Sequence, residues 1–263
     1  MISYLFRLLP DASIEDGEQE LLELGLEHIY CIEDDFSGDK LIGGLSKKKL
    51  KIDALAHLIL SEEKESEGID WQSQWSQFAE DFRDGISHID LSRFGGASTL
   101  LLSPGPGFGD LSHPTTYLML ELMDGRVAGE RIIDIGCGSG ILSLAALKLG
   151  AASALGIDID EAALEHARQN SALNHLFAQF SLHIPKDQPK ENILLMNMIF
   201  PEQQIVMKER GQLNPLAKLW IASGILAEQR EDYLKQAKKW GWDLIEEKER
   251  SGWLGLVFSS RVF

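Results

Sequence analysis

The residues best suited to chemistry are a glycine-rich segment and an acidic segment further along the chain. The first is Arg131-Ile-Ile-Asp-Ile-Gly-Cys-Gly-Ser-Gly140, and the second is Gly156-Ile-Asp-Ile-Asp160. Glycine has no Cβ, so a glycine-rich backbone can turn sharply and approach a ligand closely. An apolar run, a glycine loop, a helix-like stretch and a second apolar run follow one another. This order predicts the strand, loop, helix and strand of a nucleotide-binding α/β sheet.

The spacing of the glycines separates two kinds of nucleotide-binding loop. The dinucleotide fingerprint G-x-G-x-x-G/A would place its third small residue at Ile141. This chain instead has glycine at positions 136, 138 and 140, with Asp134 two residues before the first. That pattern resembles the cofactor loop of the S-adenosylmethionine (SAM)-dependent methyltransferases. An NAD-dependent enzyme is disfavoured by the same spacing.

Each part of the motif has a predicted role in holding the cofactor. Asp158 ends the second apolar run, where a carboxylate can accept hydrogen bonds from both ribose hydroxyls. The glycine loop precedes a helix N-terminus, which favours a carboxylate such as that of SAM, or a phosphate. The alternative is a glycine-rich turn in an unrelated α/β protein. We therefore predict a cofactor-binding set made up of Asp134, Gly136, Gly138, Gly140 and Asp158.

Composition narrows the class of protein. The 263 residues are 44% hydrophobic and 25% charged, with a net charge of −16, as in an ordinary globular protein. The acidic balance argues against direct nucleic-acid binding and would suit a basic protein partner, although solubility alone also explains it. Neither Cys31 nor Cys137 suggests a disulfide, and the histidines show no metal-ligand spacing. We expect no metal, no membrane span, no signal peptide and a cytoplasmic location.

The chain is predicted to contain a small domain, a linker and a larger domain. Residues 1–65 show strand-like and helix-like stretches in the order β-α-β-β-α, which suggests a ferredoxin-like layer. The first helix is expected from Ser13 to about Ile29 and the second from Ile52 to about Leu60. Residues 66–95 are interpreted as a linker that contains a helix with Trp71 and Trp75 on one face, more plausibly for packing than for ligand binding.

Residues 96–263 are predicted to form a Rossmann-like α/β domain. After a loop rich in glycine and proline, a helix is expected from Pro114, and strands and helices then alternate from Arg131 onward. A helix is expected at 225–240, followed by a hairpin that closes a seven-strand sheet with an antiparallel last strand. The strands are expected at about 132–135, 154–159, 180–184, 193–198, 219–222, 242–247 and 253–259.

Five segments together resemble the bacterial ribosomal protein L11 methyltransferase family. The resemblance extends over nearly the whole chain and is weakest over the first 65 residues. The segments are Trp71-Gln-Ser-Gln-Trp75, Gly107-Phe-Gly-Asp-Leu-Ser-His-Pro-Thr-Thr116, Ile133–Leu142 with Lys148–Ala151, Gly156–Asp160 and Ser223-Gly-Ile-Leu-Ala-Glu-Gln229.

The resemblance implies a SAM-dependent enzyme that methylates amino groups of a ribosomal protein, recognised by the small N-terminal domain. It adds Thr116 and Asn197 to Gly136 and Asp158 as cofactor-site residues. Asn197 ends the predicted fourth strand, where its amide oxygen could accept a hydrogen bond from the attacking amine, so it is also the predicted catalytic residue.

The chain departs from the family pattern at two places. The family usually has Phe-Gly-Thr-Gly where this chain has Phe108-Gly-Asp-Leu111, and Asn-Ile-Leu-Ala where it has Asn197-Met-Ile-Phe200. Asp110 could contact the sulfonium or the amine, or could be a solvated loop acid. The departures leave three hypotheses open: methylation of a lysine or N-terminal amine of protein L11, methylation of another acceptor, and a SAM-binding module without catalysis.

Methyl transfer from a sulfonium is an in-line displacement, so positioning of donor and acceptor supplies much of the rate. The acceptor nitrogen must be neutral, and deprotonating a lysine at pH 7 costs about 4–5 kcal/mol. An apolar rim would lower the pKa of the lysine by desolvation. Candidates for this rim are Phe108, Met198, Ile199 and Phe200. His113 is interpreted as a structural residue at a helix start rather than a base.

Overall fold

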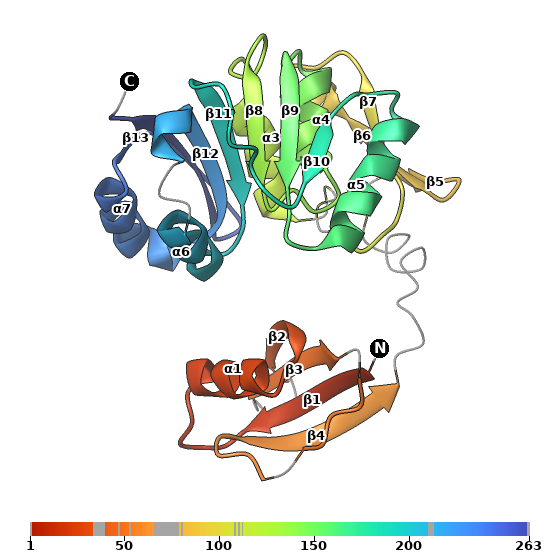
Figure 1. The fold of residues 1–263 in the computed structure, drawn as a ribbon, viewed down its shortest axis with the longest axis vertical. Coiled ribbons are helices and arrows are strands. Elements are labelled where there is room, and N and C mark those ends of the chain that lie inside the picture. The colour runs from red at the N-terminus through yellow and green to blue at the C-terminus, as the bar shows by residue number, and fades with distance from the viewer. Residues whose placement is uncertain are drawn as a thin grey trace. The chain divides into compact units, whose positions relative to one another are not determined.

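The protein consists of two compact units, Met1–Asp70 and Trp71–Phe263 (Figure 1). The computed structural model describes residues 2–33, 40–46, 48–52, 54–65, 79, 81–107, 109, 111, 113–209 and 213–261.

The first unit is a four-stranded antiparallel sheet covered by one helix in the part that is described. The strand order is β2-β3-β1-β4, so β1 and β3 lie at the centre, as in a split β-α-β layer. Its core contains Tyr4, Phe6 and Ile42 from the sheet and Leu21 from the helix. The elements are β1 (Ile2–Leu8), α1 (Ile14–Glu23), β2 (Glu27–Glu33), β3 (Lys40–Ser46) and β4 (Leu58–Glu65).

Two expectations for this unit need correction. Helix α1 begins after the Ser13 cap, which exchanges hydrogen bonds with Asp16, but it ends at Glu23 rather than Ile29. Gly25 follows with a φ of +84°, a left-handed conformation that commonly ends a helix. The second predicted helix, 52–60, is wrong: 58–65 is a strand that pairs with β1. Pairing satisfies the backbone along that edge of β1 and still buries Leu58 in the core.

The described part of the predicted linker belongs to the second unit. A three-stranded antiparallel sheet is formed there, and the predicted boundary at residue 96 falls inside it. Ile89, Leu91 and Phe94 are buried with side chains of the helices α3 (Pro114–Met123) and α4 (Ile141–Lys148), so this segment packs as core rather than as a connection. The tryptophan pair at 71 and 75 lies outside the described residues. The elements are β5 (Phe82–Arg83), β6 (Ile86–Asp90), the 3-10 helix Leu91–Phe94 and β7 (Thr99–Leu102).

The predicted seven-strand sheet is confirmed. Its order is β10-β9-β8-β11-β12-β14-β13, and the strands from β10 to β12 are parallel. The last strand, β14, runs antiparallel to both β12 and β13. The strands are β8 (Arg131–Ile135), β9 (Ser153–Ile157), β10 (Gln179–Ser181), β11 (Asn192–Asn197), β12 (Ala217–Leu226), β13 (Trp242–Arg250) and β14 (Trp253–Ser260).

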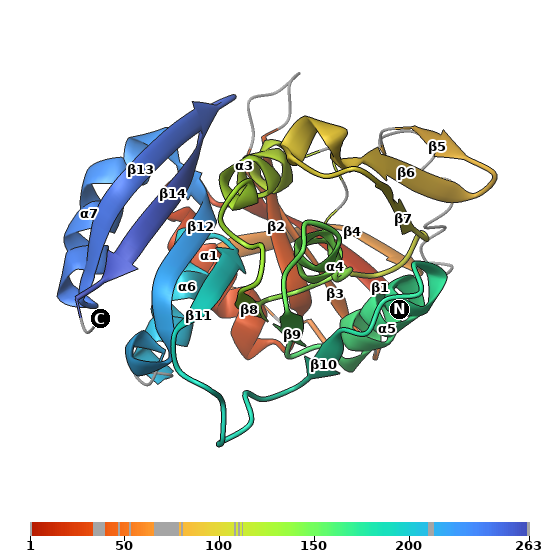
Figure 2. The same ribbon diagram turned by 90° about the horizontal axis from the view of Figure 1, so that it is seen from above.

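Helices bury the two faces of this sheet in separate cores, because successive strand residues point to opposite faces. Ile132 and Ile193 pack with α3 and α4, whereas Ile133 and Leu194 pack with α6 and α7. Figure 2 shows the first pair of helices on one side of the sheet and the second pair on the other. The helices are α3 (Pro114–Met123), α4 (Ile141–Lys148), α5 (Glu161–Leu173), α6 (Phe200–Glu209) and α7 (Arg230–Lys239).

The helix expected at 225–240 starts later than predicted. Ile225 and Leu226 still pair with Leu254 and Trp253 of β14, so they extend β12, and α7 begins only at Arg230. Pairing of these two residues with β14 prevents the helix from starting earlier. In the part of the chain that the structure describes, no helix is long and apolar enough to cross a membrane.

An aromatic cluster fills the core between the sheet and α7. The Trp220 ring stacks on Phe258 at a centroid distance of 4.9 Å and lies 5.6 Å from Trp242 and 6.1 Å from Tyr233. All four side chains are almost completely buried. Large rings of this kind supply much of the apolar area that a core removes from water.

Replacing the central ring should therefore destabilise the second unit strongly. We expect Trp220→Ala to lower the free energy of unfolding by about 3–5 kcal/mol, because it removes buried contacts and leaves a cavity. Urea unfolding followed by circular dichroism measures the change. Ile245→Ala is the control, because Ile245 lies on β13 of the same sheet but is 56% exposed, and it should cost less than about 0.5 kcal/mol. Equal losses in the two variants would contradict the assignment of Trp220 to the core.

Candidate functional site

The predicted site residues lie where the strand order of the large sheet reverses. Strands β8 and β11 are neighbours, but the chain moves outward from β8 through β9 on one side and outward from β11 through β12 on the other. Open α/β sheets bind ligands in the crevice at such a reversal, beyond the carboxyl ends of the strands. Gly136 follows β8, Asp158 follows β9 and Asn197 ends β11, so the structure brings all three to this edge.

The glycine loop after β8 has a conformation that its residues make possible. Gly136, Gly138 and Gly140 have φ values of +71°, +53° and +81°, in the left-handed region where a Cβ is unfavourable. The amides of Gly136 and Cys137 donate to the Ile157 carbonyl at 2.7 and 3.0 Å, which ties the loop to the end of β9. Gly140 is the residue before α4, so the loop leads directly into the helix N-terminus.

Asp158 holds the same loop from the neighbouring strand. Its Oδ2 accepts a hydrogen bond from the Gly138 amide at 2.9 Å, and its Oδ1 accepts one from the Asp160 amide at 3.0 Å. An ionised carboxylate has about four acceptor positions, so capacity remains for the hydroxyls of a ligand. Asp158, the predicted partner of the ribose hydroxyls, therefore also holds the glycine loop in place, a role that the sequence alone did not indicate.

Asp134 lies beneath the loop rather than in the open crevice. Its side chain is buried, and Oδ2 accepts hydrogen bonds from the Ser143 amide and hydroxyl at 3.1 and 2.7 Å, which fastens β8 to α4. Oδ1 is buried with no hydrogen-bond partner among the described residues. Burial raises the pKa of the Asp134 carboxyl to about 7, against the opposing hydrogen bonds from Ser143.

Thr116 occupies the first turn of α3. His113 caps this helix by accepting a hydrogen bond from the Thr115 amide, and its ring packs edge-on against Trp253 at 5.1 Å. These contacts agree with the structural interpretation of His113. The Thr116 side chain is buried, and its Oγ1 has no hydrogen-bond partner among the described residues. A buried hydroxyl without a partner costs free energy, which suits a position that a polar ligand completes.

The turn after Asn197 depends on contacts with the next strand. Gln203 of α6 donates from Nε2 to the carbonyls of Met198 and Ser223 at 2.6 and 2.9 Å, and Met198 donates its amide to the Ser223 carbonyl. Gly224 has a φ of +90°, and an added Cβ would lie 2.1 Å from the Met198 carbonyl oxygen. The glycine of the Ser-Gly-Ile-Leu segment therefore makes room for the turn that carries Asn197. Gln203 lies in no recognisable motif, so the sequence did not predict its role.

The predicted apolar rim is only partly assembled. Ile199 is 50% exposed beside Asn197, whereas Met198 packs against Gly136, and Phe200 turns its ring edge-on to Tyr233 in the core. Phe108 and Asp110 lie outside the described residues. Among the candidates that the structure describes, Ile199 is the exposed apolar side chain at this edge.

The crevice has a negative character. Glu202 lies in the first turn of α6, directly after the departure from the family pattern. Packing around its carboxyl group raises the pKa of Glu202, and the nearby charge of Asp158 raises it further. Two carboxyl groups on facing elements favour a cationic ligand. No group of three or more metal-binding side chains occurs among the described residues.

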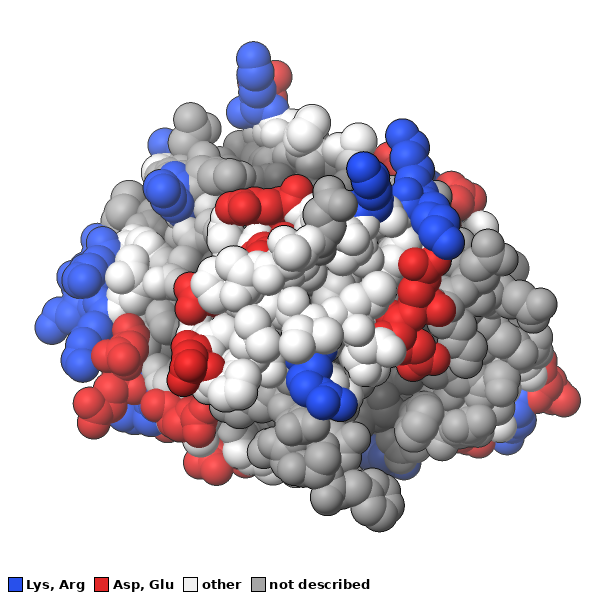
Figure 3. Space-filling model, turned by 90° about the horizontal axis from the view of Figure 1, so that it is seen from below, with Lys and Arg blue, Asp and Glu red and all other residues white. Residues whose placement is uncertain are grey.

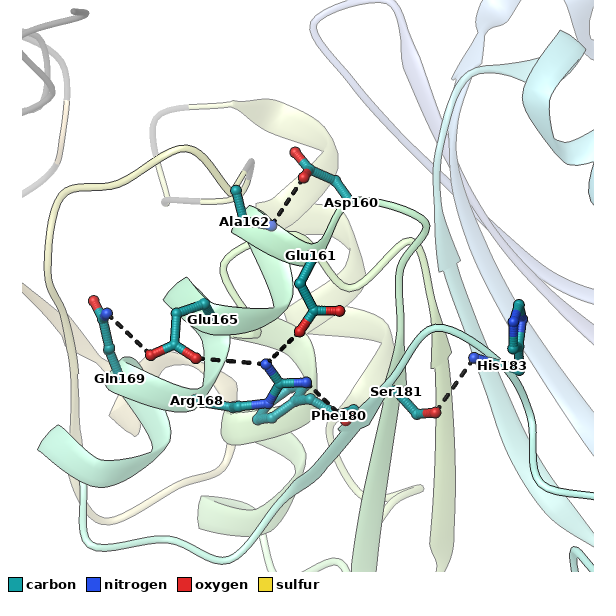
Figure 4. Close-up of polar contacts among 9 residues, drawn as sticks. All are labelled: Asp160, Glu161, Ala162, Glu165, Arg168, Gln169, Phe180, Ser181 and His183. Atoms are coloured by element: carbon teal, nitrogen blue, oxygen red, sulfur yellow. Dashed lines mark hydrogen bonds and ion pairs between the residues drawn. The ribbon is translucent and has the colours of Figure 1, made fainter.

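Helix α5 and strand β10 support the glycine loop from the outer side. The Phe180 ring lies where a Cβ at Gly140 or Gly156 would contact it, at 3.2 and 2.6 Å. Arg168 donates to Glu161 at 2.9 Å and to the Phe180 carbonyl at 3.4 Å, so it connects α5 to β10 (Figure 4). These contacts support the loop from the β10 side of the sheet, and they were not predicted from the sequence.

The buried acid gives a prediction for the pH dependence of stability. The raised pKa of Asp134 means that the folded state holds its proton up to about pH 7, whereas the unfolded carboxyl loses it near pH 3.8. Stability should therefore fall as the pH rises from 4 to 8. Asp134→Asn removes the penalty and keeps an acceptor for Ser143. We expect it to stabilise the free protein at pH 8 by at most about 4 kcal/mol, and hardly at all at pH 4.

Thermal unfolding of the free protein at both pH values measures this difference. Asp187→Asn, which removes a carboxylate from an exposed loop, is the control and should change stability by less than about 0.5 kcal/mol. A less stable Asp134→Asn protein at pH 8 would show instead that the ionised carboxylate has a favourable partner.

The comparisons with known proteins agree with this geometry. The family model for ribosomal protein L11 methyltransferase (PrmA) matches residues 18–261. The protein named ribosomal protein L11 methyltransferase from Pseudomonas paraeruginosa is 39% identical over 195 residues, which cover 70% of this chain and 66% of the relative. One from Pseudomonas syringae pv. tomato is 41% identical over 172 residues, 61% of this chain and 56% of that protein. The chain thus matches less than two thirds of these relatives' length.

A solved structure gives the same result. The ribosomal protein L11 methylase from Lactobacillus delbrueckii subsp. bulgaricus superposes with a TM-score of 0.56 at 26% identity, over 66% of this chain and 98% of that chain. Together with the family model, which matches most of the chain, this likeness and the crevice described above lead to one conclusion: the chain belongs to the ribosomal protein L11 methyltransferase family.

Proposed function

We propose that this chain transfers methyl groups from SAM to lysine or N-terminal amines of ribosomal protein L11. The observation that carries the proposal is the meeting of the glycine loop, Asp158 and Asn197 at the strand-order reversal of the sheet. The names of the relatives support L11 as the substrate. A ribosomal substrate implies a cytoplasmic reaction.

The described residues fit SAM. The methionine carboxylate suits the loop that leads into α4, and the Thr116 hydroxyl, which has no partner among the described residues, is available to a polar group of the ligand. Asp158 retains acceptor capacity for ribose hydroxyls. When bound, SAM supplies an electrophilic methyl group on a sulfonium. The carboxyl groups of Asp158 and Glu202 favour that positive charge. A bound ligand of this kind also gives the buried Thr116 hydroxyl a hydrogen-bond partner.

The chain's own residues would act on the acceptor by orientation and desolvation. The Asn197 side chain at the end of β11 would accept a hydrogen bond from the amine and hold its lone pair toward the methyl group. The exposed Ile199 beside it would exclude water and lower the pKa of the amine. Glu202 would attract the ammonium form, which must lose a proton to solvent before its nitrogen can accept the methyl group. Positioning of this kind needs no dedicated general base.

A basic protein suits this chain better than a nucleic acid does as partner. The net charge is −16, and on the face drawn in Figure 3 the basic side chains are interspersed with acidic ones rather than gathered in one patch. A nucleic-acid surface would need a concentrated basic region. We infer steering of a basic ribosomal protein toward an acidic enzyme.

The proposal is tested by incubating the purified protein with labelled SAM and unmethylated L11, followed by mass spectrometry of the product. Methyl groups on lysines or on the N-terminus of L11 are expected. In Asn197→Ala the rate of transfer should fall about 100-fold, because the amine loses its orienting group. The affinity for SAM, measured by calorimetry, should change less than the rate.

Asp158→Ala is the matched comparison on the cofactor side. It should weaken SAM binding at least tenfold, because a charged hydrogen-bond acceptor is lost. SAM binding without transfer to L11 would contradict the proposed catalysis and favour a binding module. Transfer to a different acceptor would keep the reaction but overturn the substrate. A wild-type protein that binds no SAM would overturn the whole proposal.

A further inference from the structure

A row of buried polar side chains along α5 holds the segment between β7 and α3. His166, Asn170 and Asn174 are four residues apart, so they lie on one face of the helix and at its end. Their side chains are 3%, 0% and 9% exposed, which is unusual for such polar groups. No motif in the sequence marks these three residues.

These side chains form most of their hydrogen bonds with backbone groups. Asn174 accepts from the Leu101 amide at 2.9 Å and donates to the Leu101 carbonyl at 2.6 Å. Asn170 accepts from the amide and hydroxyl of Ser103 at 2.9 and 2.8 Å. Asn170 also donates to the Ser139 carbonyl at 2.9 Å, so one side chain connects this segment to the glycine loop.

His166 makes the contact nearest the loop. The Gly107 amide donates to its Nδ1 at 3.2 Å, and its Nε2 lies 2.7 Å from the Ser103 carbonyl. An amide can only donate and a carbonyl can only accept, so the ring must be the neutral form with its proton on Nε2. Burial lowers the pKa of His166, which keeps the ring neutral at pH 7.

The held segment lies directly on the glycine loop. A Cβ at Gly107 would be 2.5 Å from the backbone of Gly138 and Ser139, and the Ser139 hydroxyl donates to the Gly109 carbonyl at 2.6 Å. A Cβ at Gly105 would be 2.5 Å from the His166 ring. The segment is therefore clamped between the imidazole on one side and the glycine loop on the other.

We propose that His166 is a positioning residue that, with Asn170, holds residues 103–107 against the glycine loop and thereby sets the affinity of the crevice for SAM. The inference rests on the proposed function for its ligand, but the holding role is a property of the free protein. His166 does not reach the reacting atoms. It acts through the backbone of Gly107, which lies in contact with Gly138, the residue that Asp158 also holds.

The test compares His166→Ala with His166→Asn in the full chain. Alanine removes both ring contacts, whereas the asparagine Oδ1 lies where Nδ1 was and can still accept from the Gly107 amide. We expect His166→Ala to weaken SAM binding at least tenfold by calorimetry and to speed hydrogen–deuterium exchange in residues 103–107 without SAM. His166→Asn should restore slow exchange at Gly107 and most of the affinity.

Ser171→Ala is the matched control for stability. Ser171 is a buried polar residue on the same helix, but its hydroxyl donates to the Leu176 carbonyl at 2.8 Å, away from the segment. It should lower the melting temperature to a similar degree with unchanged exchange at 103–107 and unchanged affinity. A loss of SAM affinity in His166→Ala no greater than in Ser171→Ala would overturn the proposal, as would unchanged exchange.

The two possible failures are distinguishable. If the wild-type protein bound no SAM but His166→Ala exchanged faster at 103–107, the proposed function would be overturned while the holding role stood. If the wild-type protein bound SAM and methylated L11 but His166→Ala behaved as Ser171→Ala does, only the role of His166 would be overturned.

Discussion

The structure of the site depends on a close approach of backbones that only glycine permits. The loop after β8 meets Asp158 from one side, the Gly107 backbone from another and the Phe180 ring from a third. A side chain at Gly107 would push these segments apart, and the φ values at Gly136 and Gly140 would strain any other residue. Because the loop has few side chains with which to pack, hydrogen bonds to neighbouring segments set its position. The buried polar groups around it are the consequence.

These neighbours give the crevice an electrostatic cost that the fold must absorb. Asp134 is buried beneath the loop, and one of its oxygens has no partner in the part of the chain that the structure describes. Asp158 and Glu202 lie near enough for their charges to interact. Carboxyl groups in such proximity destabilise the free protein, and a cation bound among them relieves the repulsion. Sites of this kind commonly sacrifice some stability for binding. The buried aromatic core around Trp220, in the same unit, can offset that loss of folding stability.

The sequence predicted the parts of the fold that follow from local pattern. Alternation of apolar runs and helical stretches located the seven strands of the large sheet, and the glycine spacing located the loop, because both signals are contiguous in the chain. The strand at 58–65 and the sheet at 82–102 were missed because pairing with distant strands, rather than local periodicity, decides them. In the site, Gln203 and His166 were missed for the same reason: each bonds to backbone at least 20 residues away in the sequence, and no motif marks such a contact.

The crevice is supported from both sides by one kind of device. On the β9 side, α5 directs His166 and Asn170 at the carbonyls and amides of the loop segments. On the β12 side, α6 directs Gln203 at the carbonyls of Met198 and Ser223. Loop backbone near a binding site cannot be paired by a sheet ladder, so buried amide and imidazole side chains have to satisfy it. Such a bond fixes the position of the segment that it holds, but it does not depend on which side chains that segment carries. The turn at Met198 and the segment at 103–107 are therefore both positioned through their main chains.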